Sequence, residues 1–585
     1  MAETTISTHM GLPSASIARR ICLSATALTT LAVAVALLWI GPTYTLLAPW
    51  DVVIHLDETW RIYSGQMPHQ DFHNAVGFFT YYLSALGMHL VGPGLFSVVV
   101  GNVIFLALST FLAAFVAYRR LNPLHGFLFT LFVILLSSAL CQIGRPADLP
   151  GYVEVYNRYG WTLTCIFFLQ AFIPPRPDVA PRSVIEGVVA GFTLTVIVFT
   201  KVSFGFFAAI ALVVALFARS LWRDRNFMLA LIAGGLTSTV AMYVVGGASL
   251  FNYAADVLSV VGAQDPHRRL GSLRAALKGG AIPAALLAVT WTLAVVVSFA
   301  RGILNRRDAI RITITATVIG VSALLIASFN TGEQGEIPLF VVLGLYILTE
   351  VRIAGSTMNG QLQERWRYVA AIAIVWFGVA GPIMLRDAKS IWVGYQSRDY
   401  AGLAPAHQIF DSPSMRDFVI RHDAYWVTEY WETSQLPRRI NDGLELMRRT
   451  VGPDSTILTL AFSNPFPFAL ELPAPRGTPI WFDYGLNYNE KVYPDAQKLF
   501  EDVGYIAIPI IRDTDGYLTG RKNVETLLKI YGPFLHDHYR EVGRSTYWIL
   551  LKRQDLASQL TPSNKAAVAG TKNALSIVRA KAKVE

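Results

Sequence analysis

The chain has 585 residues, of which 53% are hydrophobic and only 15% are charged, and its formal net charge is +9. Soluble domains carry about 25% charged residues, and a soluble fold could not bury this much apolar surface. We therefore expect the lipid bilayer to be part of the solvent. This composition argues against a disordered chain and against a soluble multidomain enzyme. The basic residues lie in short clusters between apolar runs, which predicts a membrane topology signal and no nucleic-acid partner.

The first apolar run, 21–40, follows Arg19 and Arg20. Its length of about 20 residues favours a retained membrane helix over a cleaved signal peptide. Ten further runs follow it, several of them at the short end of the spanning range: 95–118, 124–143, 161–173, 184–200, 204–217, 227–245, 282–300, 310–328, 337–348 and 369–385. The sequence therefore predicts a polytopic α-helical membrane protein with about eleven transmembrane helices.

Clusters of arginine fall on alternate connections between these runs, as at Arg119/Arg120, Arg219/Arg223/Arg225 and Arg301/Arg306/Arg307. By the positive-inside rule this side is cytoplasmic. The N-terminus is then inside the cell, and an odd number of spans places the C-terminal part outside.

Three regions are expected along the chain: a membrane domain over 1–385, a small outer α/β domain over 386–558, and a disordered Ala/Lys-rich tail over 559–585. In the outer domain, strand-like runs at 456–462, 505–511 and 546–552 accompany a helical stretch at 524–531. No Walker, Rossmann or zinc-finger motif is present in the sequence.

The first outer loop contains most of the candidate chemistry. On a helix, Asp51, His55 and Glu58 would share one face, while Asp57 would pair with Arg61 at i,i+4. A solvated, salt-bridged helix beside the membrane explains this spacing without any catalytic role. Farther on, His69, Asp71 and His73 alternate at period two and would face one way on an extended segment. They are candidates for a divalent cation, although such residues more often line a polar sugar pocket.

The loop resembles the first loop of GT-C glycosyltransferases, which are polytopic enzymes that use a lipid-phosphate sugar donor. The matching stretches are Asp57-Glu58-Thr-Trp-Arg-Ile-Tyr, Gly65-Gln-Met-Pro-His-Gln-Asp71-Phe72 and, less specifically, Tyr156-Asn-Arg-Tyr-Gly-Trp161. The families most similar in pattern are the bacterial lipid A aminoarabinose transferases, the protein O-mannosyltransferases and the rhizobial lipopolysaccharide sugar transferases. The resemblance implies a GT-C-like membrane domain followed by an extracytoplasmic domain.

The resemblance further implies transfer of a monosaccharide from a polyprenyl-phosphate donor to an envelope acceptor, a lipid-linked glycan or lipopolysaccharide. The reaction would take place on the periplasmic side of a bacterial inner membrane. The phosphate leaves already ionised, so the reaction needs a carboxylate base and cations rather than a general acid. Asp57 is the expected base, and Glu58 would position either that base or the acceptor. Attack opposite the phosphate would invert the anomeric centre.

Other residues complete the expected site. Either Asp148 or Glu154 in the second outer loop would face the first-loop carboxylate, unless both form only surface salt bridges. Cations on the outer side are the candidates for the donor phosphate, or else they snorkel to lipid headgroups: Lys201, Arg268, Arg269 and Arg274. The expected substrate pocket comprises His55, Arg61, His69, Asp71, His73, Asn157 and Arg158.

Two other functional classes fit part of the pattern. A transporter or flippase for a lipid-linked or small solute would explain the spans, but it predicts inverted repeats and charges at the midplane of the membrane. The charges here are concentrated in the outer loops. A non-catalytic assembly or sensor protein would use the outer domain for binding, and the acid-rich first loop argues against that class.

Overall fold

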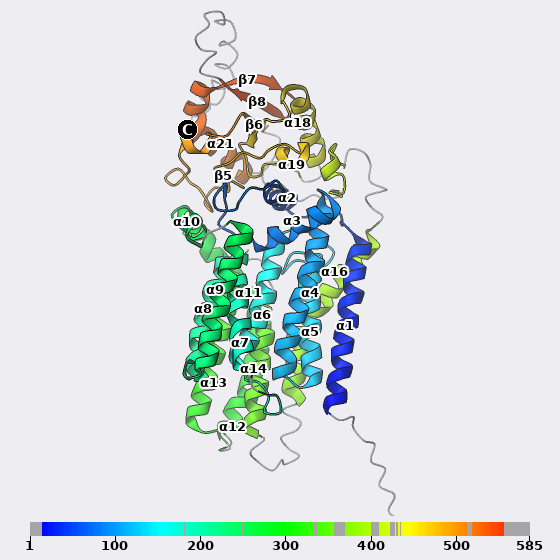
Figure 1. The fold of residues 1–585 in the computed structure, drawn as a ribbon, viewed down its shortest axis with the longest axis vertical. Helices are drawn as coiled ribbons and strands as arrows, with labels where there is room; N and C mark the ends of the chain where they lie inside the picture. The colour runs from blue at the N-terminus through cyan, green and yellow to red at the C-terminus, as the bar shows by residue number, and fades with distance from the viewer. Residues whose placement is uncertain are drawn as a thin grey trace, which may run out of the picture.

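The computed structural model describes residues 15–180, 182–247, 250–300, 302, 304–330, 336–355, 369–398, 409–421, 427–428, 431–432, 435–511 and 518–554. A bundle of long helices stands below a small α/β domain (Figure 1). The expected disordered tail lies outside these ranges.

Seven of the described helices are long and apolar enough to cross a membrane. Each of the eleven predicted apolar runs overlaps a helix of the bundle, so the expected multi-pass helical architecture is confirmed, while eleven crossings stay a prediction. The helices concerned are α1 (Ala15–Ile40), α4 (Leu95–Arg120), α5 (Pro123–Ser138), α6 (Val155–Phe172), α7 (Ser183–Thr200), α8 (Val202–Ala218), α9 (Arg225–Gly246), α11 (Pro266–Trp291) with η2 (Thr292–Val296) and α12 (Val297–Ala300), α13 (Arg306–Phe329), α14 (Leu339–Gly355), and η3 (Ile374–Ala380) with α16 (Gly381–Gln396).

Helices α7 and α9 pack closely because glycines line their contact. A Cβ atom added at Gly191 would lie 2.2 Å from the Leu231 carbonyl oxygen, and one at Gly234 would lie 2.6 Å from that of Val188. Small residues at such positions let two membrane helices approach through their backbones. Helix α7 ends at Thr200, and Lys201 stands at the turn into α8.

The outer domain is built on a four-stranded sheet in the order β4-β6-β8-β7, from β4 (Ile457–Thr459), β6 (Tyr505–Pro509), β7 (Tyr539–Arg544) and β8 (Trp548–Arg553). Strands β4 and β6 are parallel, and the other neighbours are antiparallel. Alternate side chains face opposite sides of the sheet. Ala507 on one face packs in the core that includes α18 (Leu436–Thr450), and Ile506 on the other packs against α21 (Leu518–His538).

The three predicted strand runs coincide with β4, β6 and β8, and the predicted helical stretch lies within α21. Helix α16 continues to Gln396, ten residues beyond the expected start of the outer domain at Arg386. The short pieces outside the sheet are η1 (Leu221–Arg223), η5 (Pro413–Met415), β2 (Val427–Thr428), β3 (Trp431–Glu432), α19 (Phe466–Leu470) and α20 (Ala496–Leu499).

The first outer loop is enclosed between the bundle and the outer domain. It forms α2 (Pro49–Tyr63) and α3 (Phe79–Val91), and α2 lies directly beneath the outer domain (Figure 1). A short strand, β1 (Phe72–His73), pairs in parallel with β5 (Thr478–Pro479) of the outer domain. The Trp60 indole also donates to the Leu472 carbonyl oxygen at 2.9 Å. The first loop therefore belongs structurally to both parts of the molecule.

Candidate functional site

Helix α2 presents two different polar faces, as the residue spacing predicts. Asp57 and Arg61 form the expected i,i+4 ion pair, with Nε and Oδ2 3.1 Å apart and both side chains fully buried. The Arg61 guanidinium also donates to the Pro475 carbonyl oxygen at 2.7 Å and to the Thr478 hydroxyl at 3.3 Å. The Asp57 face therefore points at the outer domain, and its carboxylate is paired with Arg61, which contacts that domain.

Asp51 and Glu58 lie on the other side of α2, among tyrosines. Glu58 is fully buried and accepts a hydrogen bond from the Asn74 amide at 2.6 Å. Burial raises its pKa well above the usual value, and the charge of Asp57 raises it further, while hydrogen bonds from Asn74 and Tyr81 oppose the shift. His55, on the same face, contacts the Ser84 hydroxyl at 2.8 Å, and burial lowers its pKa to about 3, so its ring is neutral.

Asp51 stands among other acids. Burial raises its pKa well above the usual value, and the negative charges of Glu154 and Asp483 raise it further. Asp51 is half-buried, whereas Asp57 and Glu58 are fully buried. Asp51 is thus the acid of α2 that keeps access to a reactant while its surroundings shift its ionisation.

The second outer loop brings Glu154 to the same place. Glu154 precedes α6 with φ 50°, a left-handed backbone conformation that costs free energy in a residue other than glycine. Its carboxylate accepts hydrogen bonds from Gln142 at 2.9 Å and from Asn157 at 2.7 Å. Asp148, the other candidate in this loop, is exposed. The structure therefore brings Glu154, and not Asp148, to the acids of α2.

Lys201 completes this cluster from the bundle. Its ammonium group donates to Asn157 Oδ1 at 3.1 Å and lies 4.8 Å from the centre of the Tyr156 ring. Burial lowers its pKa to about 8, and Arg269 lowers it further, while the charge of Glu154 opposes the shift. We define the acid–lysine cluster as Asp51, Glu58, Glu154, Asn157 and Lys201.

The basic start of α11 reaches this cluster from the edge of the bundle. The exposed Arg268 binds both carboxylate oxygens of Asp483 in the outer domain, at 3.1 and 3.2 Å. Arg269 is half-buried, binds Gln264 with its Nε at 3.0 Å and lies over the Phe329 ring. Arg274 is exposed, beyond these contacts. Of the three predicted arginines, Arg269 thus acts on Lys201, and Arg268 binds the Asp483 carboxylate that acts on Asp51.

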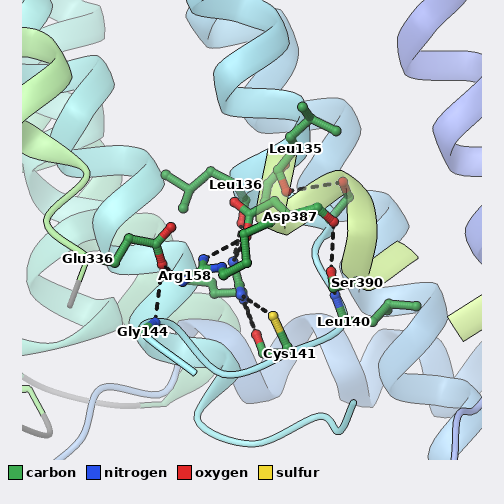
Figure 2. A network of polar contacts seen from close by, with 12 residues as sticks. Leu135, Leu136, Leu140, Cys141, Gly144, Arg158, Glu336, Asp387 and Ser390 are labelled. Carbon is green, nitrogen blue, oxygen red and sulfur yellow. Dashed lines mark hydrogen bonds and ion pairs between the residues drawn. The ribbon is translucent and has the colours of Figure 1, made fainter. Parts of the chain in front are cut away.

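Arg158 has a different place from the one expected. Its guanidinium lies at the centre of the network in Figure 2, where it donates to the carbonyl oxygens of Cys141 at 2.7 Å and Leu136 at 3.1 Å and pairs with Asp387 of α16. Nearby, Arg386 pairs with both Asp387 and Glu336. Arg158 therefore fastens the start of α6 to α5 and α16, and its donors are occupied by protein groups rather than open to a sugar.

The alternating residues after α2 have different partners. His69 and His73 both bind Asp256, whereas Asp71 accepts from the Met67 backbone N–H at 2.8 Å and lies 3.8 Å from Arg476. The expectation that all three face one way is therefore wrong. Within the ranges that the structure describes, no group of three or more His, Cys, Asp or Glu could hold a metal ion.

Several residues of the site were not singled out from the sequence as site residues. Asn74, Tyr81 and Tyr156 surround the carboxylates, and Asp256 and Asp483 reach them from distant elements. The sequence marks Asp51 only through the helical spacing that places it on one face of α2 with His55 and Glu58. No local motif marks Asp256 or Asp483, because the segments they contact are about 180 and 430 residues away in the sequence.

No protein-family model and no curated protein matches this sequence. Similar solved structures include ArnT from Cupriavidus metallidurans bound to undecaprenyl phosphate, with 13% identity, a TM-score of 0.45, and 90% of this chain and 97% of that chain covered. The apo state of the same protein has 14% identity, a TM-score of 0.46 and coverage of 92% and 100%. Arabinofuranosyltransferase AftD from Mycobacteria has 12% identity, a TM-score of 0.39 and coverage of 92% and 40%.

Proposed function

We propose that the chain is a membrane glycosyltransferase that moves a monosaccharide from a polyprenyl-phosphate donor to a hydroxyl group of an envelope glycan or lipid. The observation that carries this proposal is the convergence of acids with cations in the acid–lysine cluster. The cluster lies where the helices that cross the membrane meet the outer domain, so a phosphate on a lipid can reach it while its tail stays among apolar helices.

The reaction needs one bond to break and one to form at the anomeric carbon of the sugar. The bond to the phosphate oxygen breaks, and the phosphate leaves with the electron pair. The acceptor oxygen attacks from the opposite face, which inverts the configuration, and its proton passes to a carboxylate. Because the departing group is already an anion, cations near the phosphate stabilise the charge that develops on it.

Asp51 is the base that the geometry favours. It is half-buried, whereas Glu58 is enclosed and bonded to Asn74, and Asp57 is held by Arg61 against the outer domain. A base must reach the proton it removes, and a raised pKa strengthens its affinity for that proton. We therefore propose Asp51 as the base in place of Asp57, which is the base expected from the sequence, and Glu58 keeps its expected role of positioning the base or the acceptor.

Lys201 and Arg269 are the proposed phosphate ligands, and Arg268 lies at the rim of the same cluster. Lys201 is a compact charge that can follow the phosphate as it leaves. The Asn157 amide donates to Glu154 and accepts from Lys201, so these two residues together hold the Lys201 side chain in place. Arg274, exposed farther along α11, has no place in this proposed site.

The proposed setting is a bacterial inner membrane, with the N-terminus in the cytoplasm and the outer domain in the periplasm. The positions of the arginine clusters support this orientation. Helices α4, α6 and α8 bring Arg119, Arg176 and Arg219 together at one end of the bundle, through contacts of Arg176 with Arg119 and of Arg219 with Gln170. This is the end opposite the outer domain (Figure 1).

The test compares two acids of the same helix. Wild-type protein and the Asp51→Asn and Asp57→Asn variants are reconstituted in lipid nanodiscs and assayed with a panel of polyprenyl-phosphate sugars. In parallel, the envelope glycans of a deletion strain complemented by each variant are analysed for sugar content. We expect a sugar that is lost on deletion to return with wild type and not with Asp51→Asn. Full transfer by Asp51→Asn would remove that residue as the base, and flux of a solute without any transferred sugar would indicate a transporter instead.

A further inference from the structure

Helix α10 (Leu250–Val261) lies at the boundary between the bundle and the outer domain (Figure 1). Its outward side is apolar and exposed, with Phe251 85% exposed and Leu258 69% exposed. Its other side is buried, with Tyr253 and Asp256 one turn apart. A helix with these two sides can lie at the membrane surface, with its apolar side toward the lipid and its polar side against the protein.

Asp256 binds three groups of the first outer loop. Its Oδ2 accepts from His69 Nδ1 at 2.8 Å and from the backbone N–H of Asn74 at 3.1 Å, and its Oδ1 accepts from His73 Nδ1 at 2.8 Å. His69 is in a left-handed backbone conformation, with φ 63°. This carboxylate therefore fixes the path of the loop over the six residues from His69 to Asn74, from an element about 180 residues away in the sequence.

Asn74 connects this part of the loop to Glu58. Its side-chain Oδ1 accepts from the Val76 backbone N–H at 2.8 Å, and its Nδ2 donates to Glu58 Oε2 at 2.6 Å. Because the amide oxygen is already used by Val76, the amide group cannot turn over without losing both bonds. The position of the Asn74 backbone thus determines where the Glu58 carboxylate is held.

The same face of α10 also contacts the residue after Lys201. The Tyr253 hydroxyl accepts a hydrogen bond from the Val202 backbone N–H at 2.9 Å, and the Tyr253 ring packs on the His69 ring with centroids 4.6 Å apart. One turn of α10 therefore contacts a neighbour of the acid–lysine cluster on each side, Asn74 beside Glu58 through Asp256 and Val202 beside Lys201 through Tyr253.

We propose that Asp256 is a positioning residue of the reaction, which holds Glu58 in its working orientation through Asn74 and ties that orientation to the docking of α10. This inference rests on the proposed function, because it assigns Asp256 a part in the same site. Asp256 itself does not touch a substrate, and its effect on the rate passes through Glu58. Removing the Asp256 carboxylate should slow the chemical step more than it weakens donor binding.

The first experiment is a double-mutant cycle of Asp256→Ala and Glu58→Gln in nanodiscs, with kcat and the donor KM measured for each variant. If Asp256 acts through Glu58, the double variant should be no slower than Glu58→Gln alone. Asp256→Ala alone should lower kcat at least about tenfold, with the donor KM within about twofold. Additive losses in the double variant, or a loss confined to KM, would overturn the proposal.

The second experiment needs no transfer activity. Hydrogen–deuterium exchange over residues 66–78 is measured in wild type, in Asp256→Ala and in the matched control Asp265→Ala, which loses only the cap at the start of α11. Exchange should accelerate in Asp256→Ala and stay unchanged in the control. Unchanged exchange in Asp256→Ala overturns the positioning role even if the protein transfers sugar. Accelerated exchange in a chain without transferase activity supports the positioning of Glu58 and overturns the proposed function alone.

Discussion

Two buried charged clusters, at opposite ends of the helical bundle, satisfy their charges in different ways. Away from the outer domain, Glu186 accepts from Arg119 at 3.1 Å and from Arg120 at 2.8 Å, while Arg219 donates to the carbonyl oxygens of Gln170 and Ala171 at 2.9 and 2.8 Å. Opposite charges there are in direct contact. This is the pattern of a cluster that holds helices together.

In the acid–lysine cluster, in contrast, like charges lie close together, although Glu154 also attracts Lys201. Asp51 faces the negative charges of Glu154 and Asp483, and Lys201 faces the positive charge of Arg269. Such an arrangement costs free energy of folding, and shifted ionisation of this kind is typical of sites that bind or transform a ligand. The comparison teaches that buried charge alone marks neither cluster as functional, whereas the repulsion among its acids distinguishes the outer one.

The largest expected effect on transfer comes from substituting Asp51. Asp51→Asn should lower transfer roughly a thousandfold, since general base catalysis contributes factors of about 10²–10⁴. It should also raise the unfolding temperature slightly, because it removes repulsion from Glu154 and Asp483. Turnover and thermal unfolding are measured on the same nanodisc samples.

Asp57→Asn is the matched control for this pair of effects. It leaves the Arg61 charge buried without its partner, so it should lower the unfolding temperature. If Asp51→Asn were as unstable as Asp57→Asn, and if the two variants were equally active, the distinction between the two faces of α2 would be lost.

Glu186 tests the paired cluster at the other end. Glu186→Gln leaves Arg119 and Arg120 without their carboxylate, and breaking a buried pair costs about 3 kcal/mol or more. We expect lower resistance to unfolding in mixed SDS micelles, with turnover per folded molecule preserved. If the variant instead lost turnover at full stability, the cluster at this end would have a functional part and the comparison would fail.

Much of the fold could be predicted because long apolar runs and alternating strands are local patterns, and each of these coincides with a helix or strand. The Asp57–Arg61 pair was also readable from spacing. Which face of α2 meets the cluster was not, because it depends on where the outer domain docks. The same holds for Asp256, whose contacts with His69 and His73 exist only after α10 folds onto the first loop.

The next largest expected effect concerns how kcat/KM for the donor depends on pH. Lys201 must be protonated to hold a phosphate, and its pKa is lowered to about 8, chiefly by burial. Because kcat/KM reports ionisations of the free enzyme, its pH profile should fall as pH rises through about 8. Lys201→Arg keeps its positive charge at higher pH, so this alkaline limb should move upward. An alkaline limb that stays in place in Lys201→Arg would assign it to another group.

The smallest expected effects lie on the acid limb of the same profile, and they have opposite signs. The negative charge of Asp483 helps to raise the pKa of Asp51, and Arg268 binds and partly neutralises Asp483. Asp483→Asn removes a negative neighbour, so Asp51 loses its proton at lower pH and the acid limb moves down. Arg268→Ala leaves the Asp483 charge without its partner, so the limb moves up.

These two variants need a plateau rate close to that of wild type for the comparison to be clean, and Arg268 is suited to it because its side chain is half exposed. Shifts of the acid limb in the same direction would show that Asp483 and Arg268 act by holding α11 against the outer domain. Shifts in opposite directions are expected only if their charges act on the carboxylate that takes the proton.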